Sequence, residues 1–131
     1  MIVRHYKDTV GTDREVKAPG GTWQSNRLLL ADEGMGFSFH ITTIHAGTET
    51  YIHYKHHLEA VYCIKGRGEI ETIDDGKVYA IEPGMMYALN LHDAHHLRAF
   101  DEPLELACVF NPPISGKEVH GPDGAYPPSE G

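Results

Sequence analysis

The stretch at residues 47–66 constrains the fold more than any other part of the chain, because it encloses a group of histidines between two strand-like segments. The segments 49–54 and 59–64 are rich in Tyr, Ile, Val and Thr, which favour β-strands. A glycine stands at each end of the stretch, and the residues between the two segments must turn. We therefore expect a hairpin whose mouth gathers three side chains, those of His53, His57 and Glu59.

Glu59 changes how the histidines of this stretch are interpreted. Three histidines in five residues, His53, His56 and His57, are by themselves typical of a solvated loop. Glu59, however, opens an apolar strand, where a carboxylate without a partner is costly. Imidazole and carboxylate groups that converge at a strand end are ligands that divalent metals use in proteins. The stretch therefore indicates a metal site.

Residues 47–66 resemble the first sequence motif of the cupin family, in which two glycines enclose two histidines and a glutamate. Lys55 stands where the second histidine is expected. The matched positions are Gly47, His53, Glu59 and Gly66. The second cupin motif is matched loosely by residues 76–87, with Glu82 at the proline position and Tyr87 in place of the last metal histidine. Two of the usual ligands are therefore absent, and a metal here must be held by a different set.

Composition narrows the classes of function. Nineteen Asp and Glu residues against eleven Lys and Arg give a net charge of −8, without the basic patch that a nucleic-acid surface needs. No apolar run approaches the roughly 18 residues of a membrane helix, and the first residues do not resemble a signal peptide. We therefore expect a cytoplasmic protein that binds neither nucleic acid nor membrane, with Cys63 and Cys108 as buried free thiols.

The rest of the chain is predicted as short strands separated by turn signals, without a convincing amphipathic helix. Residues 65–68 and 74–77 are expected to form hairpin turns on either side of one strand. The barrel is expected to cover residues 1–115, followed by a tail at 116–131. Together with the cupin motifs, this pattern predicts one all-β domain over residues 1–131, a jelly-roll-like, double-stranded β-barrel of the cupin type. Its other strands are expected at residues 1–6, 22–30, 37–44, 69–73, 77–81, 85–89, 97–100 and 105–110.

Two of these predicted strands carry polar side chains on one face. Alternation places three residues of the strand at 22–30 together, namely Trp23, Ser25 and Arg27. The strand at 37–44 has a small polar face formed by Ser38, His40 and Thr42. Such a face fits a barrel strand that lines a wet cavity. Exposure of the same face to solvent is an equally good interpretation of the pattern.

The tail at residues 116–131 is rich in Pro and Gly and is expected to be mobile. Such a segment is usually a frayed chain end. Glu118 and His120, however, are titratable groups in a segment that is free to fold across the mouth of a barrel. A lid is therefore the alternative interpretation.

Three side chains near the predicted barrel rim can converge on a metal, namely Glu59, Tyr87 and His95. Tyr87 lies on the inner face of its predicted strand, and His95 follows eight residues later, far enough for the chain to double back. Carboxylate, phenolate and imidazole ligands with open positions suit iron, or another Lewis-acidic divalent ion, better than structural zinc. Spacing does not exclude four competing histidines, His53, His57, His92 and His96.

Over most of its length the chain resembles the ectoine synthase family. The matching segments include Gly-Met-Gly-Phe-Ser-Phe-His-Ile-Thr-Thr at 34–43, His-Leu-Glu-Ala-Val at 57–61, Met-Tyr-Ala-Leu at 86–89, Ala-Cys-Val-Phe-Asn-Pro-Pro at 107–113 and Gly-Lys-Glu-Val-His at 116–120. The Phe-Asn-Pro-Pro block is not general to cupins, which makes the resemblance specific. The family closes N-γ-acetyl-L-2,4-diaminobutyrate into ectoine, a cyclic amidine that serves as a compatible solute, with loss of water.

The resemblance implies a hydro-lyase of the osmotic stress response that uses ferrous iron, replaceable by another divalent metal, and that forms a homodimer. Carried over by position, the iron ligands are Glu59, Tyr87 and His95. The residues implied for substrate binding are Trp23, Arg27, Thr42 and Phe110. Those implied for acid–base catalysis are Tyr54, His57, Glu118 and His120. The sequence does not rank these four as acid or base.

Three other interpretations remain open. An iron-dependent dioxygenase or an epimerase is disfavoured by Lys55 and Tyr87, because the usual oxygenase site relies on histidines at these positions. A cupin that binds a small molecule without converting it would not need Glu118 and His120. A metal-free barrel, with the three predicted ligands as ordinary rim residues, has little support against a resemblance that covers most of the chain.

Overall fold

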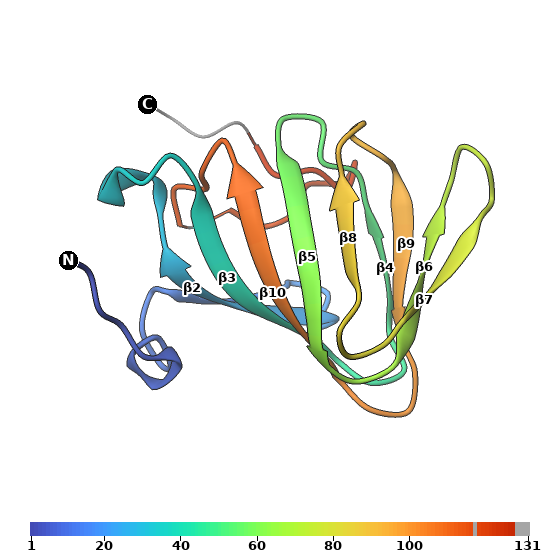
Figure 1. Ribbon diagram of the computed structural model, residues 1–131, viewed down its shortest axis with the longest axis horizontal. Coiled ribbons are helices and arrows are strands. Elements are labelled where there is room, and N and C mark those ends of the chain that lie inside the picture. Colours follow the sequence, from blue (N-terminus) through green and yellow to red (C-terminus); the bar gives the residue numbers. More distant parts are fainter. Residues whose placement is uncertain (117, 128–131) are drawn as a thin grey trace.

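The computed structural model describes residues 1–116 and 118–127, which form ten strands in two antiparallel sheets (Figure 1). The order of the six-stranded sheet is β1 (Glu15–Lys17), β2 (Trp23–Leu29), β3 (Ser38–Ile44), β10 (Leu104–Asn111), β5 (Leu58–Lys65) and β8 (Met86–Leu89). The order of the four-stranded sheet is β4 (Glu49–Ile52), β9 (His95–Ala99), β6 (Gly68–Thr72) and β7 (Val78–Ile81). The only helices in the described residues are two 3-10 turns, η1 (Tyr6–Asp8) and η2 (Ala31–Glu33). The predicted all-β, cupin-type fold is confirmed.

The core lies between the two sheets and is built by alternation along the strands. In β5 every second side chain from Glu59 to Cys63 is buried, while the residues between them are exposed. β10 adds Leu104 and Leu106 to the same cluster, and the four-stranded sheet contributes Leu97. Burying such an aliphatic side chain contributes about 1.5–3 kcal/mol, so this shared layer holds the sheets together. Both cysteines are buried and free, as predicted.

The predicted hairpin between residues 49–54 and 59–64 is wrong. β4 pairs with β9 in the four-stranded sheet, whereas β5 pairs with β10 and β8 in the six-stranded sheet. The turn between them therefore crosses from one sheet to the other. A hairpin and a crossing share the same local pattern of strand, turn and strand, and only the distant partners distinguish them.

Residues 65–68 also cross between the sheets instead of forming the predicted hairpin, because β5 and β6 lie in different sheets. Two glycines allow the tight crossing. A Cβ atom at Gly68 would lie 2.1 Å from the backbone oxygen of Arg98, and one at Gly66 would lie 2.3 Å from that of Pro103. The predicted turn at 74–77 is a hairpin, which joins β6 to β7.

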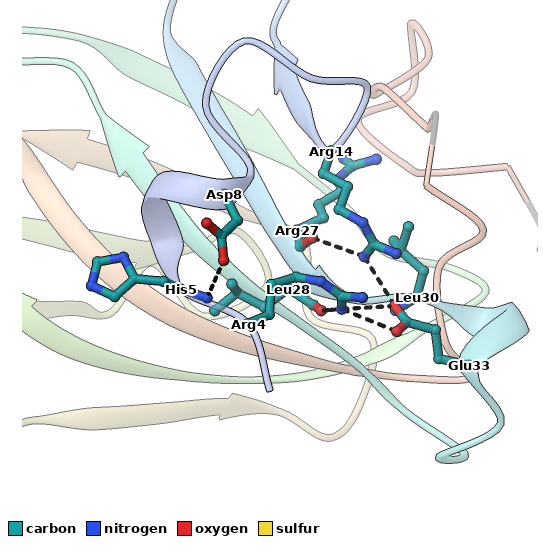
Figure 2. A network of polar contacts seen from close by, with 8 residues as sticks. All are labelled: Arg4, His5, Asp8, Arg14, Arg27, Leu28, Leu30 and Glu33. Carbon is teal, nitrogen blue, oxygen red and sulfur yellow. Dashed lines mark hydrogen bonds and ion pairs between the residues drawn. The ribbon is translucent and has the colours of Figure 1, made fainter. Parts of the chain in front are cut away.

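The predicted strand at residues 1–6 is also absent. Ile2 and Val3 are exposed and pair with no strand in the described part of the chain, and the short β1 pairs with β2 instead. Arg4 and Arg14 attach this end of the chain to the barrel through the carboxylate of Glu33 (Figure 2). Polar contacts to η2, not strand pairing, therefore hold the N-terminal segment in place.

The segment after β10 crosses the upper end of the barrel in Figure 1, where it is drawn in red. The N–H of Ile114 donates to the hydroxyl of Ser38 at 3.0 Å, and the N–H of His53 donates to the carbonyl of Gly124 at 2.8 Å. Residue 117 and residues 128–131 of the predicted tail lie outside the described residues. Within the described ranges, no helix has the length and apolar character needed to cross a membrane.

Candidate active site

A small cavity of about 20 Å³ lies between the sheets, beneath the segment after β10. Its walls combine aromatic and aliphatic side chains with a few polar groups. Most residues predicted for substrate binding, catalysis or metal binding take part in it. The lining residues are Trp23, Thr42, Ile44, Ile52, Tyr54, Glu59, Tyr87, Leu97, Leu106, Cys108, Phe110, His120 and Tyr126.

A larger hollow of about 390 Å³ lies between the β6–β7 hairpin and β8. It is lined by Asp74, Asp75 and Tyr79, among others, and is open to solvent. Tyr87 is the only residue predicted for the site that also lines this hollow. Seven of the predicted residues line the smaller cavity, which is therefore the better candidate for the site.

Glu59 and Tyr87 reach the cavity from neighbouring strands. Val61 is the direct partner of Tyr87, and Glu59 lies two residues away on the same inward face of β5. His95 begins β9, in the opposite sheet, and its ring centroid lies 6.4 Å from that of Tyr87. Glu59 and Tyr87 therefore line the cavity from one sheet, and His95 approaches Tyr87 from the opposite sheet without lining the cavity itself.

His95 is oriented as a ligand requires. Its Nδ1 donates to the backbone carbonyl of Asp93 at 2.8 Å, which leaves the lone pair on Nε2. Nε2 is buried and finds no hydrogen-bond partner in residues 1–116 and 118–127. Burial lowers the pKa of the imidazole, so it is neutral at pH 7 and able to bind a cation. An orphaned, oriented imidazole nitrogen fits a metal site.

The acids of the set lie in an apolar environment. Burial raises the pKa of the Glu59 carboxyl to about 8 and raises that of the Tyr87 hydroxyl well above its usual value. A divalent cation would favour both ionised forms, and this set of hard oxygen and nitrogen donors suits one. Within the described residues, no cluster of three His, Cys, Asp or Glu side chains could hold a metal, so the set depends on the phenol of Tyr87.

Two of the competing histidines are engaged by other contacts. His96 packs on Tyr51 and approaches Glu49 at 3.4 Å, away from the cavity. Nδ1 of His92 lies 2.8 Å from the backbone oxygen of Tyr54. Lys55, at the position of the missing cupin histidine, is exposed and forms an ion pair with a residue of the tail.

Arg27 is a fully buried cation on the inner face of β2. Its Nε donates to the hydroxyl of Ser25 at 3.2 Å, and its Nη2 donates to the backbone oxygen of Glu118 at 2.8 Å. Nη1 has no hydrogen-bond partner in the described part of the chain and lies 3.9 Å from the carboxylate of Glu118. The predicted face of Trp23, Ser25 and Arg27 is confirmed, and it points inward.

The carboxylate of Glu118 is engaged by its own loop. Its two oxygens accept hydrogen bonds from the backbone N–H groups of Ser115 at 2.7 Å and Gly116 at 2.8 Å. Burial acts to raise the pKa of this carboxyl, but the backbone donors outweigh it and lower the pKa. Glu118 is therefore ionised and anchors the loop, which makes it a poor proton acceptor.

Tyr54 and His120 form a buried hydrogen-bonded pair. The hydroxyl of Tyr54 lies 2.7 Å from Nε2 of His120. Burial raises the pKa of the phenol well above its usual value and lowers the pKa of the imidazole to about 4. Both groups are therefore neutral at pH 7.

His57 is fully buried, and neither ring nitrogen has a hydrogen-bond partner among the described residues. Its ring stands nearly perpendicular to the ring of Phe110, at a centroid distance of 6.0 Å. Burial is the main reason that the pKa of this imidazole is lowered, although the nearby charge of Glu118 acts to raise it. His57 is therefore a neutral imidazole whose hydrogen-bonding capacity is free for a ligand.

Two side chains of the site were not predicted. Tyr126 stacks on Tyr54 at a centroid distance of 4.9 Å, within a tail that was expected to be mobile. His40 is buried against Phe110 at 5.1 Å and lies 3.4 Å from the hydroxyl of Ser25. The inward polar face of β3 was one of two open interpretations for His40, whereas an aromatic residue in a Pro- and Gly-rich tail was the only signal for Tyr126.

Comparison with known proteins shows the family. The family model described as ectoine synthase matches residues 1–130. The L-ectoine synthase of Wolinella succinogenes is 57% identical over 131 residues, which cover 100% of this chain and 99% of the relative. That of Desulfatibacillum aliphaticivorans is 59% identical over 127 residues, which cover 97% of each chain.

Solved structures with a similar fold include an ectoine synthase and a more distant cupin. The ectoine synthase from P. lautus has a TM-score of 0.83 and 53% identity, covering 88% of this chain and 81% of that one. A cupin-2 domain protein from Rhodospirillum rubrum has a TM-score of 0.60 at 22% identity, covering 69% and 60%, and supports the cupin fold alone. The chain belongs to the ectoine synthase family, and it is an enzyme of that type.

Proposed function

We propose that this enzyme converts N-γ-acetyl-L-2,4-diaminobutyrate into the compatible solute ectoine by intramolecular condensation. A bond forms between the α-nitrogen and the acetyl carbon, and the acetyl oxygen leaves as water with two protons of the α-ammonium group. The observation that carries the proposal is the set of buried nitrogens on Arg27, His57 and His95 that have no partner in the described residues. Each of these side chains lies against an aromatic residue that lines the cavity, in a member of this family. An unpaired buried donor is costly, so such a set indicates a ligand.

The first task of the site is to fold one flexible molecule so that its ends meet. Nη1 of Arg27 is free to bind the substrate carboxylate through a charge-assisted hydrogen bond. Trp23 and Phe110 supply apolar walls, and Thr42 adds a hydroxyl on the same side of the barrel. Exclusion of bulk water favours a step that expels water.

The proposal gives the proton transfers to two of the predicted catalytic residues. His57 is the neutral imidazole with both nitrogens free, so it is the base that takes a proton from the α-ammonium. The phenol of Tyr54, held by His120, is the acid that delivers a proton to the departing hydroxyl. Glu118 fixes the loop beside Arg27 instead of exchanging protons.

Glu59, Tyr87 and His95 would hold ferrous iron or another divalent metal in this proposal. When bound, such a metal supplies Lewis-acid polarisation of the acetyl oxygen. The buried carboxyl and phenol and the orphaned Nε2 of His95 support the assignment of these three residues.

The test is product formation. Protein reconstituted anaerobically with ferrous iron and incubated with the acetylated diamino acid should give the cyclic amidine by NMR, without oxygen uptake. The signal should disappear with a chelator and return with iron. Thermal stabilisation by the substrate without product would replace the proposal with a binding protein, and oxygen-dependent turnover would replace it with a dioxygenase.

Single substitutions separate the roles. Glu59→Ala, Tyr87→Ala and His95→Ala should each lose bound iron while the barrel stays folded, and full metal content in all three would sink the ligand assignment. His57→Gln should keep its iron and lose about 10²–10⁴-fold in kcat, the range for a general base. A cytoplasmic location and a homodimer remain predictions, and light scattering on the purified protein measures the oligomeric state.

A further inference from the structure

The loop at residues 90–94 joins two of the proposed iron ligands. It follows β8, which carries Tyr87, and it ends before His95, the first residue of β9. Because β8 and β9 belong to different sheets, the loop also crosses from one sheet to the other. The position of His95 relative to Tyr87 therefore depends on how this loop is held.

The centre of the loop has an unusual backbone conformation. His92 has a φ of +53°, and it is the only residue other than glycine with a positive φ in the described ranges. Side chains other than those of Asn, Asp and His rarely adopt this left-handed region. Such a conformation persists only where the surrounding structure enforces it, and it is frequent at functional sites. The contacts that hold His92 in this conformation are therefore informative.

The side chain of His92 ties the loop to the segment that follows β4. Its Nδ1 lies 2.8 Å from the backbone oxygen of Tyr54, and since a carbonyl oxygen only accepts, Nδ1 carries the proton and donates. The backbone ladder between β4 and β9 ends at the pair of Ile52 and His95. Beyond that pair, within the described residues, the side chain of His92 supplies the link between the two segments that the ladder no longer provides.

The next residues of the loop orient the iron ligand. The carbonyl of Asp93, which directly follows His92, accepts the hydrogen bond from Nδ1 of His95 at 2.8 Å. The carbonyl of Ala94 accepts a hydrogen bond at 2.9 Å from the N–H of Ile73, in the β6–β7 hairpin. The loop is thus held at Ala94 by a backbone bond and at His92 by a side chain, and the carbonyl that orients His95 lies between these two points. A shift of His92 would move that carbonyl.

We propose that His92 is a positioning residue for the reaction, which holds the acid Tyr54 and the iron ligand His95 in a fixed relation. Its Nδ1–H holds the backbone of Tyr54, and its left-handed conformation directs the next carbonyl to His95. Loss of the partners that orient a ligating histidine typically costs about 10–100-fold in metal affinity or activity. The inference rests on the proposed function, because it takes the roles of Tyr54 and His95 from there.

Two substitutions of His92 separate its hydrogen bond from its backbone conformation. Asn and Asp both suit a left-handed residue, and both carry a polar atom on Cγ, where histidine has Nδ1. His92→Asn keeps a donor at that point, whereas His92→Asp, which is ionised at pH 7, does not. His92→Asn should therefore match the wild-type protein within about twofold in iron affinity and kcat.

His92→Asp should raise the dissociation constant for ferrous iron about tenfold and lower kcat about tenfold. KM should stay within about twofold, because Arg27 binds the substrate carboxylate from another strand. A role confined to stability would not separate kcat from KM in this way, and it would not be rescued by one of two side chains of the same shape.

Asn90→Asp is the matched control. It makes the same exchange of an amide for a carboxylate in the same loop, at an exposed residue whose side chain forms no hydrogen bond in the described part of the chain. It should match the wild-type protein in iron affinity and in kcat. The negative charge that His92→Asp adds would by itself favour a cation, so weaker iron binding in that variant comes from the lost hydrogen bond.

Anaerobic titration with ferrous iron against a competing chelator gives the dissociation constant without any substrate, and the product assay gives kcat and KM. Equal iron affinity and kcat in His92→Asn and His92→Asp would overturn the proposal, and so would a difference between them in the urea midpoint alone.

If His92→Asp does not fold, His92→Gly decides the question. Glycine accepts the left-handed backbone but has no donor, so this variant should show the same losses of about tenfold. Wild-type iron affinity and kcat in His92→Gly would overturn the proposal. Absence of product in the wild-type protein would refute the proposed reaction, whereas the iron affinities of the variants would still decide whether His92 positions the ligand.

Discussion

Two arginine–glutamate groups lie beside β2, one outside the barrel and one inside, and they differ in how completely their charges are paired. Outside, Glu33 accepts hydrogen bonds from Arg4 at 3.0 Å and Arg14 at 2.9 Å, and both arginines also bond backbone oxygens of β2 (Figure 2). Inside, Nη1 of Arg27 stops 3.9 Å short of Glu118, although the arginine is fully buried.

The difference separates a group that stabilises the fold from one that is kept ready for a ligand. A buried donor without a partner costs about 1–3 kcal/mol, so the arrangement around Arg27 opposes stability. The loop of Glu118 makes the gap permanent, because its backbone N–H groups take up the carboxylate that would otherwise close on the arginine. Unused hydrogen-bonding capacity on Arg27, and not the presence of charge, therefore distinguishes the inner group from the outer one.

Exchanging each arginine for methionine should give opposite results. Arg27→Met should lower kcat/KM by about 100-fold, mostly through KM, because a charge-assisted contact of about 1.5–3 kcal/mol with the substrate carboxylate is lost. Its free energy of unfolding should change little, because removal of a buried, incompletely paired charge offsets the loss of the hydrogen bonds to Ser25 and Glu118, whose carboxylate keeps its two backbone donors. The product assay and urea denaturation measure the two effects.

Arg14→Met is the matched control. It removes a cation from the outer group, so it should lower the free energy of unfolding and leave kcat/KM within about twofold, as surface changes away from the site do. The assignment of the outer group to stability and of Arg27 to ligand binding would fail if Arg14→Met lost as much activity as Arg27→Met. It would also fail if Arg27→Met unfolded while Arg14→Met did not.

The strands with one apolar face could be predicted from the sequence, because burial on one side imposes a period of two. β10 follows this rule from end to end, and β5 follows it from Leu58 to Ile64. Apart from the β6–β7 hairpin, the partners of the strands could not be predicted. The turn at 55–57 and the crossing at Gly66 depend on pairing with β9 and β10, which are distant in the chain. The N-terminal Ile2 and Val3 have strand-forming side chains but no strand beside them in the described residues.

The candidate site, too, could be predicted from the sequence only in part. Its polar residues were assigned because the chain resembles a family, and the structure brings them to one end of the barrel. What each does depends on its neighbours: Glu118 is engaged by two backbone donors and His57 by none in the described ranges, a difference that residue types cannot reveal. The position of Tyr126 was hidden because Pro and Gly around it have weak local preferences, and packing alone orders its ring.

Acid should protonate His120 in the site and Glu33 outside the barrel in different pH ranges, and so affect stability differently. Burial lowers the pKa of His120 to about 4, from an ordinary value of 6.5, so the unfolded chain binds the proton more tightly than the folded one. Between pH 7 and pH 5 this histidine should therefore lower the free energy of unfolding by on the order of 1–2 kcal/mol. In His120→Gln, the fall in the free energy of unfolding between pH 7 and pH 5 should be smaller by that amount.

Glu33 is the reference for this measurement. Burial acts to raise the pKa of its carboxyl, but hydrogen bonds from Arg14 and Arg4 outweigh it and hold the pKa below the ordinary 4.5. Its contribution to stability is present above that pH and is lost only as the pH falls through the lowered value. Glu33→Gln should therefore show the same change between pH 7 and pH 5 as the wild-type protein. A flattened profile in Glu33→Gln, or an unaltered one in His120→Gln, would contradict the assignment.

At pH 7 the two smallest effects of the series are expected from Glu33→Gln and Glu82→Gln. The amide keeps one acceptor oxygen for the two arginines but loses the charge, so the free energy of unfolding should fall by about 1 kcal/mol, the usual net value of a hydrogen bond. Glu82→Gln, at the exposed ion pair with Arg67, should leave the urea midpoint unchanged, because more than half of each side chain is in solvent. Neither change should alter product formation. Loss of activity in Glu33→Gln with an unchanged midpoint would mean that the outer group also serves the reaction, and the distinction between paired and unpaired arginines would no longer mark the site.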